Sequence, residues 1–424
     1  MEKITRKDFE TWKAWTVSET GLRQAICLTH AFGDLSEYFF KPEVLSRAGF
    51  SPFLPKLSGE LGTCGVLLVL PGVPESSVFR RAVVLPLQWR AGGTWDDFRL
   101  PSSLGELASR VRAIVSPEKT WTLHLAPEIR KFPDISDLKM EWDSAFLPLY
   151  GGLALANQGL LPNPAVFATG AWQKSLRPVT GLAEKMFAAC ECEATVFFYP
   201  ENCSWEEIDR MKGLEFPSLK RQAIPSGENL FSVTRDYLSL LAREPDMSAT
   251  EILLENYYLL LPREKQQDFY LRRLKEKIAE RVRPDVKETD QGRTLVCWIS
   301  GGNELIDLAV AVFQPSQVVL LATENFHSAG KVFQRIENSV PATLCRFSEN
   351  LEITALKTAV RKKIAEVASG KPLLLDLTSG KVSMSLSLYD CGLTDSRYLY
   401  WNTDSSARNQ PQPHTTKPTV WNIC

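Results

Sequence analysis

The stretch TLVCWISGGNELIDLAVAVFQPSQVVLLAT, residues 294–323, decides the fold class of the C-terminal part of this chain. An apolar run of strand length is followed there by a glycine turn, a helix-like segment and a second apolar run. The same order repeats through ATLCRF (342–347), PLLLDLT (372–378) and RYLYWNT (397–403), with helical patterns between them. Short apolar strands that alternate with helices predict a parallel, doubly wound α/β sheet, whose ligands bind outside the carboxyl ends of the strands.

The patterns along the whole chain predict five segments. Residues 61–240 interleave strand-like runs such as CGVLLVLPG and ATVFFYP irregularly with helix-like runs, which indicates an α+β domain. Residues 1–60 predict a helical extension, and residues 241–288 predict a charged helical linker that a proline ends. The doubly wound domain covers residues 289–404, and the polar, proline-bearing residues 405–424 predict a flexible tail.

Composition limits the classes of function. Of 424 residues, 49 are Lys or Arg and 50 are Asp or Glu, so the net charge of −1 gives no overall attraction for nucleic acid. No apolar stretch has the length of a membrane span, so we expect no membrane partner. The nine cysteines are scattered and odd in number, which favours a reducing cytoplasm. Their one cluster, Cys190, Cys192 and Cys203, lacks the second pair or histidine of a zinc site, so no metal is expected.

A charged helical pattern at residues 271–283 leaves two interpretations open. Its lysines and arginines are spaced so that ion pairs with acidic residues one turn away can form on a solvated helix. The alternative is a basic helix that binds nucleic acid, which salt-dependent binding to RNA or DNA would reveal.

A candidate nucleophile lies in EWDSAFLPLYGGLALANQGLLPNPAVFATGAW, residues 141–172. Ser144 precedes an apolar run there, and the simplest interpretation is that Asp143 or Ser144 caps a helix. A serine hydroxyl becomes a good nucleophile only when a base takes its proton, and a lysine can do so if burial lowers its pKa. Lys185 lies in an apolar helical pattern, in which its neighbours Leu182, Met186 and Phe187 could bury its amine.

The segment around these residues resembles the proteolytic domain of Lon proteases. Ser144-Ala145 matches the serine motif of that family, and Thr169-Gly170 matches its Thr-Gly turn, 25 positions further on. Gly181 to Lys185 matches the lysine helix, and TVFFYPEN matches the following strand and its end. The resemblance implies a Ser-Lys dyad of Ser144 and Lys185, with Thr169 holding the amine. Backbone N–H groups at the start of the Ser144 helix are then expected to bind the oxyanion.

Departures from the Lon pattern support a different interpretation. Trp142-Asp143 stands where the family has Gly-Pro, Phe146 replaces a glycine, and Ala171 replaces a glutamate. These changes alter the surroundings of the serine, so an inactive Lon-fold regulator or scaffold is the alternative to an active protease.

A Lon protease unfolds its substrates with an attached ATPase, which we expect to be absent here. The one Gly-Lys after a predicted strand, in LDLTSGKVS, has Leu375 where a P-loop needs glycine and Val382 where it needs serine or threonine. The sequence therefore predicts an ATP-independent endopeptidase.

The C-terminal domain resembles the CARF domains of CRISPR-associated proteins, which bind cyclic oligoadenylates made by type III CRISPR complexes. The likeness rests on ISGGNE after the first strand and on LDLTSGKVSM after a later one. Glycine-rich loops at strand ends present backbone N–H groups to phosphates, and a lysine adds a fixed charge. The expected ligand contacts are Ser300, Gly301, Gly302, Asn303, Thr378, Ser379, Gly380 and Lys381.

Together the two resemblances imply a CRISPR-associated Lon-like protease fused to a CARF sensor. We expect a Ser-Lys peptidase with no cofactor, switched in type III CRISPR antiviral defence by a cyclic oligoadenylate, cyclic tetra-adenylate in particular. The expected partners are a protein substrate, for example a toxin or antitoxin, and a second copy of the chain paired through the CARF domain.

Overall fold

The chain folds into two units that divide between Pro245 and Asp246. The computed structural model describes residues 57–69, 82–92, 100–126, 141–214, 216–300, 303–378, 381–389, 395–404 and 412–422. Most of the helical extension predicted at 1–60 therefore lies outside the described residues.

The first unit holds three small sheets in its described part: an antiparallel sheet β1-β2-β3, a parallel sheet β4-β7-β8 and the hairpin β5-β6. The strands are β1 (Thr63–Val69), β2 (Ala82–Ala91), β3 (Trp121–Leu125), β4 (Val166–Ala168), β5 (Ala171–Trp172), β6 (Leu176–Arg177), β7 (Val196–Pro200) and β8 (Lys220–Ile224). The helices are α5 (Ser102–Val115), the 3₁₀ turn η3 (Asp143–Ala145), α6 (Phe146–Asn157), α7 (Leu182–Glu191), α8 (Trp205–Lys212) and α9 (Leu230–Leu241). Strands and helices are mixed here as an α+β domain requires.

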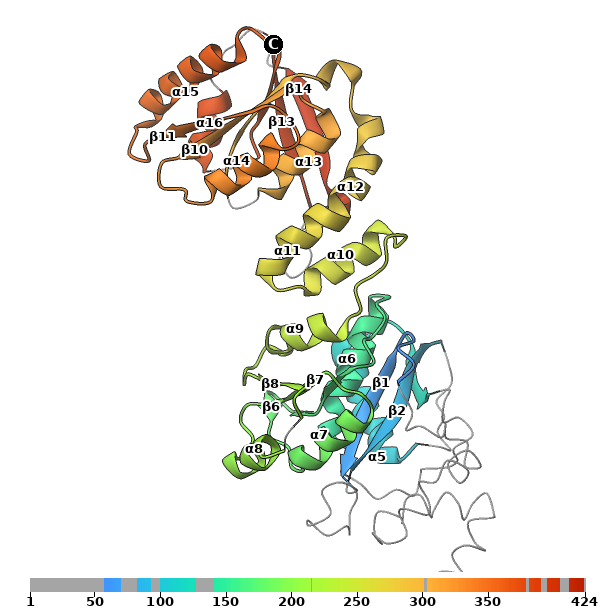
Figure 1. Cartoon of the computed structure of the whole chain (residues 1–424). Coiled ribbons are helices and arrows are strands. Elements are labelled where there is room, and N and C mark those ends of the chain that lie inside the picture. The colour runs from blue at the N-terminus through green and yellow to red at the C-terminus, as the bar shows by residue number, and fades with distance from the viewer. Residues whose placement is uncertain are drawn as a thin grey trace, which may run out of the picture. The chain divides into compact units, whose positions relative to one another are not determined.

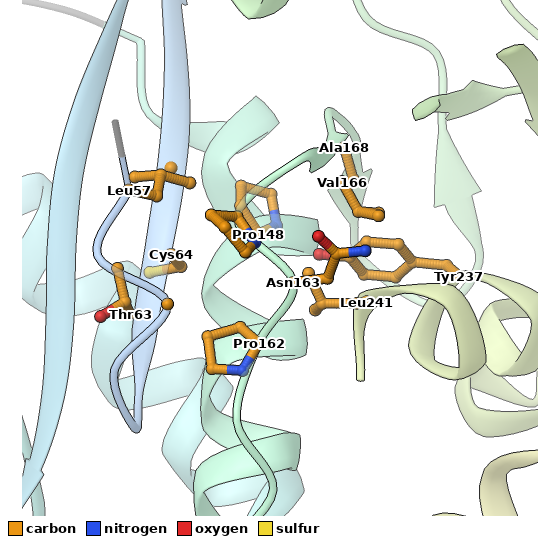
Figure 2. A pocket seen from close by; sticks show the side chains of 13 residues that line it. Leu57, Thr63, Cys64, Pro148, Pro162, Asn163, Val166, Ala168, Tyr237 and Leu241 are labelled. Carbon is orange, nitrogen blue, oxygen red and sulfur yellow. The ribbon is translucent and has the colours of Figure 1, made fainter. Parts of the chain in front are cut away.

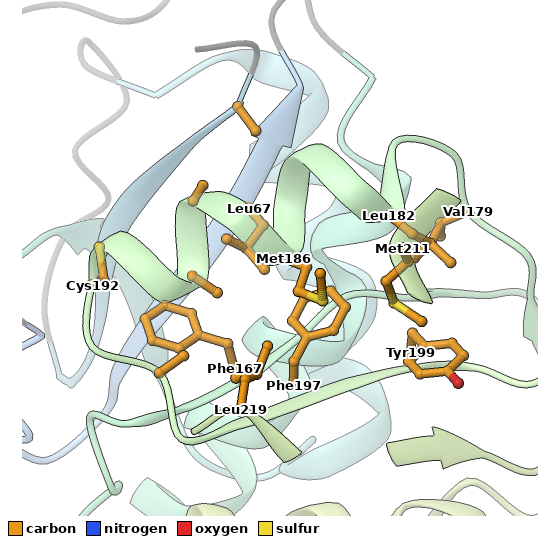
Figure 3. Packing of buried hydrophobic residues seen from close by; sticks show 14 of the residues in the cluster. Leu67, Phe167, Val179, Leu182, Met186, Cys192, Phe197, Tyr199, Met211 and Leu219 are labelled. Carbon is orange, nitrogen blue, oxygen red and sulfur yellow. The ribbon is translucent and has the colours of Figure 1, made fainter. Parts of the chain in front are cut away.

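Helix α7 lies in the core of this unit, between strands of two sheets. Met186 of α7 is fully buried in one cluster with Leu67 of β1, Phe167 of β4 and Phe197 of β7 (Figure 3). Complete burial of each such side chain contributes roughly 1.5–3 kcal/mol. The packing therefore fixes the helix that carries Lys185.

The second unit contains the predicted doubly wound domain. Its six-stranded sheet has the order β11-β10-β9-β12-β13-β14, with parallel pairing from β11 to β13 and an antiparallel β14. The strands are β9 (Thr294–Trp298), β10 (Gln317–Thr323), β11 (Ala342–Phe347), β12 (Leu373–Asp376), β13 (Ser396–Asn402) and β14 (Lys417–Asn422). The helices between them are α13 (Glu304–Phe313), α14 (Ala329–Glu337), α15 (Ile353–Ala368) and α16 (Val382–Tyr389). The strand-and-helix alternation read from the sequence is confirmed.

Helices cover both faces of this sheet. Trp298 and Phe347 pack on one face with residues of α15 and α16, and their rings are 5.6 Å apart. The alternate strand residues Leu295 and Cys297 are also fully buried, on the opposite face. Figure 1 shows α13 and α14 on the side away from α15 and α16.

Helices in the segment predicted as a linker, 241–288, belong to this second unit. They are α10 (Glu251–Leu260), α11 (Arg263–Phe269), the π-helix η4 (Tyr270–Leu274) and α12 (Lys275–Val282), followed by the 3₁₀ turns η5 (Arg283–Asp285) and η6 (Glu288–Asp290). Leu254, Phe269 and Ile278 are buried, so these helices pack an apolar face rather than standing free in solvent.

The expectation of a flexible tail at 405–424 is wrong for its described residues. After the turn η7 (Pro413–Thr415), strand β14 pairs antiparallel with β13, and Trp421 stacks on Tyr398 with ring centroids 6.1 Å apart. The prolines suggested a coil, but an edge strand accommodates a proline such as Pro418 because one row of its N–H groups needs no partner strand.

None of the helices that the structure describes is long and apolar enough to cross a membrane.

Candidate active site

Ser144 lies in the 3₁₀ turn η3, immediately before α6, and is not a helix cap. The N-cap residue of η3 is Trp142, that of α6 is Ala145, and neither makes a side-chain cap hydrogen bond. Capping therefore does not account for this serine.

The Thr-Gly turn is docked on the serine turn by backbone hydrogen bonds. Gly170 donates its N–H to the carbonyl of Ser144 at 3.0 Å, and Leu147 donates its N–H to the carbonyl of Gly170 at 3.1 Å. A Cβ at position 170 would lie 2.5 Å from a methyl carbon of Leu147, so a larger residue would have to displace this fully buried side chain. The two segments are thereby held in one geometry.

Thr169 is completely buried beside this turn. Its N–H donates to the carbonyl of Phe198 at 3.0 Å, but its Oγ1 has no hydrogen-bond partner among the described residues. A buried hydroxyl without a partner is unfavourable by about 1–3 kcal/mol. Such a group is expected where a substrate or a mobile side chain supplies the missing bond.

Lys185 lies in the first turn of α7, which starts at Gly181 in the left-handed conformation with φ 69°. Only 4% of Lys185 is exposed, and burial lowers the pKa of its amine from the ordinary 10.5 to about 8. Leu182 and Met186 on the same helix are fully buried, whereas Phe187 is half-buried. The desolvation predicted from the apolar helix pattern is confirmed.

Acidic groups around Lys185 oppose this effect without reversing it. Glu207, Glu184 and Glu141 each raise the pKa of the amine, and Glu207 has the largest effect. Glu184 is also paired with Arg210 at 3.0 Å. Burial remains the largest cause, so a substantial fraction of the lysine is neutral near pH 8.

Ser144 and Lys185 line the same cleft, which has a volume of about 810 Å³. The other lining residues are Val69, Arg110, Glu141, Asp143, Ala171, Trp172, Gln173, Arg177, Pro178, Val179 and Thr180. A cleft of this size accommodates a peptide segment or a small molecule. The structure thus brings together two residues that are 41 positions apart in the sequence.

The walls of this cleft were not predicted. Arg110 comes from α5 and donates to the carbonyl of Trp172 at 2.7 Å, and Arg177 comes from β6 and donates to Gln173 at 3.0 Å. No motif joins these elements in the sequence, because only tertiary folding brings α5 beside the β5–β6 hairpin.

We expected backbone N–H groups at the start of the Ser144 helix to be free to bind an oxyanion. This expectation is wrong for three of these groups. Ala145 donates to Trp142, Phe146 to Asp143 and Leu147 to Gly170, so these donors already have acceptors. The N–H of Ser144 itself has no acceptor among the described residues. The tight 3₁₀ turn uses the donors that an open helix start would have left free.

A second cavity beside α6 holds no ligand site. It lies between Pro148, Cys64 and Tyr237 and has a volume of about 10 Å³, at the lower limit for one water molecule (Figure 2). Burial raises the pKa of both the Cys64 thiol and the Tyr237 hydroxyl. These groups stay neutral and act in packing.

The predicted ligand loops of the second unit lie at a switch point of its sheet. From β9 the chain runs to β10 and β11 on one side, whereas β12 and β13 lie on the other side of β9. Asp376, at the end of β12, is opposite Cys297 of the parallel β9, so both strands end at the same edge of the sheet. A crevice at such a point is where doubly wound folds bind ligands.

Polar side chains hold the described parts of these loops. Asn303 accepts the N–H of Ser300 at 3.0 Å, and Thr378 accepts the N–H of Trp401 at 2.8 Å. Asp376 is fully buried and accepts the N–H of Thr378 at 2.8 Å. Burial raises the pKa of Asp376 to about 6, and the Thr378 hydrogen bonds oppose the rise.

Lys381 is exposed, and its N–H contacts the sulfur of Met384 at 3.4 Å. The remaining predicted contacts, Gly301, Gly302, Ser379 and Gly380, lie outside the described residues. Among the described residues no group of three or more His, Cys, Asp or Glu side chains could hold a metal ion.

The basic helix pattern at 271–283 is largely neutralised. Arg272 pairs with Asp268 at 2.8 Å, Arg281 with Glu251 at 3.0 Å, and Arg283 with Glu276 at 3.7 Å. Arg281 also donates to the carbonyl of Thr416 at 3.2 Å. These pairs favour a structural role over nucleic-acid binding.

No protein-family model matches this chain, and none of the curated proteins matches it significantly. Among solved structures it is similar to Can2 from Sulfobacillus thermosulfidooxidans, whose structure was determined in complex with cyclic tetra-adenylate. The two share 17% identity over 31% of this chain and 35% of that chain, with a TM-score of 0.22. At this TM-score the match carries no argument about the fold or ligand of this chain.

Proposed function

We propose that this chain is an ATP-independent serine endopeptidase with Ser144 as nucleophile and Lys185 as general base. The observation that carries the proposal is that Ser144 and a buried lysine with a pKa of about 8 line one cleft. A lysine of this pKa is a usable base near neutral pH. The sequence resemblance to the Lon proteolytic domain supports the same roles.

In the proposed reaction, the Oγ of Ser144 attacks a substrate carbonyl while the neutral amine of Lys185 takes the hydroxyl proton. The protonated amine then gives that proton to the leaving nitrogen, and water releases the acyl group in a second round of the same steps. Thr169 would hold the amine, because its buried hydroxyl has no other partner among the described residues. The N–H of Ser144 is the remaining donor at the turn for the oxyanion.

The second unit is proposed to bind a cyclic oligoadenylate, with cyclic tetra-adenylate as the first candidate. The support is that β9 and β12, whose carboxyl ends lead to Ser300 and Thr378, lie at the switch point of the sheet, together with the resemblance of the following sequences to CARF loops. Binding there would control proteolysis, and the expected outcome in the cell is cleavage of a protein partner, such as a toxin or antitoxin, during type III CRISPR defence.

A second copy of the chain is the proposed partner of α16. Val382, Leu386 and Tyr389 are 77%, 41% and 42% exposed. They are spaced four and three residues apart, so they lie on one face of the helix. This apolar face directly follows the Thr378–Lys381 loop, so a homodimer would bring two such loops to one interface.

A catalytically silent regulator is the second candidate. The N–H groups of Ala145, Phe146 and Leu147 already have acceptors in this structure, which leaves few donors for an oxyanion. In that case the second unit would bind its ligand while the first unit served as a scaffold.

A fluorophosphonate probe tests the dyad, because it labels only an activated serine. With the full-length chain and cyclic tetra-adenylate, mass spectrometry should find the probe on Ser144, and both Ser144→Ala and Lys185→Ala should lose labelling by about a thousandfold or more. The exposed Ser218→Ala and Lys174→Ala variants are matched controls. Equal labelling of Lys185→Ala and wild type would refute the dyad, and ligand binding without any Ser144 labelling would favour the silent regulator.

A further inference from the structure

The first turn of α7 is held by a carboxylate from another helix. The two oxygens of Glu207, on α8, accept the N–H of Gly181 at 3.1 Å and the N–H of Leu182 at 2.9 Å. These N–H groups open α7 and have no intrahelical acceptor. Lys185 follows within the same turn and donates its own N–H to the carbonyl of Gly181 at 3.0 Å.

Glu207 is itself positioned by a cap that the sequence contains. Ser204 is the N-cap of α8, and its hydroxyl oxygen accepts the N–H of Glu207 at 3.3 Å. In a capping box the glutamate at this position would reach back to the N-cap backbone. Here the carboxylate of Glu207 instead accepts hydrogen bonds from the first N–H groups of α7.

Helix α8 holds α7 at a second point. Arg210, three residues after Glu207, pairs with the buried Glu184 at 3.0 Å. This cation compensates Glu184, whereas Glu207 forms no ion pair within the described part of the chain. The two helices are therefore coupled at two points of the turn that precedes Lys185.

We propose that Glu207 is a positioning residue of this active site, which fixes the Lys185 turn through two backbone hydrogen bonds and whose negative charge stabilises the protonated amine. The inference rests on the proposed function and adds a residue that neither motif contains. Of the acidic groups that favour the charged amine, Glu207 has the largest effect.

No other charged group described around Lys185 combines the same features. The thiol of Cys203 contacts the backbone N–H of Val179 at 3.4 Å, and burial raises the pKa of this thiol, so it stays neutral. The charged or titratable side chains on the elements that pack on α7 are Glu206, Glu207, Asp209, Arg210 and Lys212 of α8, Tyr199 of β7, Cys64 of β1 and Arg90 of β2, with Cys203 just before α8. The cleft wall adds Glu141, Asp143, Arg110 and Arg177. Glu207 alone among them combines a carboxylate with hydrogen bonds to the lysine turn.

The test measures the pH dependence of Ser144 labelling by the fluorophosphonate in the full-length chain with cyclic tetra-adenylate. In Glu207→Gln the acid limb should move to lower pH by about one unit, because an opposite charge that favoured the protonated amine is gone. Glu206→Gln removes a neighbouring exposed carboxylate and should leave the limb in place. Glu207→Asp keeps the charge with a shorter reach, so it should lower the rate with little movement of the limb.

A second readout does not depend on proteolytic activity. Competitive acetylation of Lys185 with trace acetic anhydride, followed by mass spectrometry, reports the titration of the amine directly, and Glu207→Gln should shift it in the same direction. If Glu207→Gln lowers labelling equally at every pH and leaves the acetylation curve unmoved, Glu207 is only a structural group and the inference is overturned. If Lys185→Ala keeps full labelling, the proposed dyad fails, yet the acetylation curves still decide the effect of Glu207.

Discussion

Lys185 and Lys381 occupy opposite environments, and each lies beside a loop that the sequence marks as functional. Lys185 is almost completely buried among apolar side chains of α7 and its neighbours, and its pKa falls to about 8. Lys381 is exposed at the start of α16. Burial disfavours the charged amine of Lys185, which suits this lysine to exchange a proton, whereas the proposed role of Lys381 is to contact a phosphate. The residue type alone does not distinguish a base from an anion contact.

The loops that hold the two sites also differ. Backbone hydrogen bonds between Ser144, Leu147 and Gly170 join the serine turn to the Thr-Gly turn. At the other site side chains hold the backbone, with Asn303 on Ser300 and Asp376 on Thr378. The first arrangement fixes two turns relative to each other, whereas the second holds the backbone where each strand ends.

The largest expected effect is the pH dependence of the first site. Lys185 acts as a base only when neutral, so the rate of Ser144 labelling should rise with pH and level off above about 8. Between pH 8 and pH 6 the neutral fraction falls about fiftyfold, and the labelling rate should fall with it. The measurement is the labelling rate across this range, with Lys174→Ala as the control. A flat profile would mean that no base of this pKa acts on Ser144.

The burial of Lys185 could be anticipated because its helix pattern places leucine and methionine around it. The docking of Gly170 on the Ser144 turn was not predicted, because the motif order says nothing about which backbone groups of the two turns meet. The surroundings could not be predicted in the same way. Whether N–H groups after Ser144 stay free depends on the choice between a 3₁₀ turn and an open helix start, and both fit the same residues.

The second unit gives the same lesson at the level of the sheet. Apolar runs of strand length predicted β9 to β13. A strand that is buried on both faces consists almost entirely of apolar residues, so such strands are visible in the sequence. Strand β14 was missed because it lies at an edge, where exposed polar residues and Pro418 are tolerated. Glu207 had a visible signal in Ser204-x-x-Glu207, but only the fold shows that its carboxylate reaches α7.

An intermediate effect is expected at the second site. If Lys381 contacts a phosphate of the ligand, Lys381→Ala should weaken binding of cyclic tetra-adenylate about ten- to a hundredfold, through the loss of a charge-assisted hydrogen bond. Calorimetry measures the affinity, and Lys362→Ala, which removes an exposed lysine of α15, is the matched control.

Lys381→Ala also distinguishes a loss of ligand binding from a loss of Ser144 reactivity. Labelling of Ser144 in Lys381→Ala should recover at higher ligand concentration, because the substitution changes how much ligand is bound and not the dyad. Ser144→Ala should bind the ligand normally and never be labelled. Equal affinity of Lys381→Ala and wild type would remove Lys381 from the ligand site.

The smallest effect is expected from the edge strand of the second unit. Trp421 of β14 stacks on Tyr398 of β13, and Arg281 and Glu255 hold the segment that leads into this strand through Thr416 and His414. Trp421→Ala removes the ring but keeps the backbone pairing, so the loss should be about 1–2 kcal/mol, or a few degrees in Tm. Differential scanning calorimetry measures the change, and Lys417→Ala, an exposed position on the same strand, should melt like wild type.

Since the Trp421 ring lies in the unit that does not hold Ser144 and Lys185, the intrinsic labelling of Ser144 should be unchanged in Trp421→Ala. A Tm equal to wild type would show that Trp421 adds nothing to the sheet, and a large loss of labelling would show that the two units depend on each other for folding.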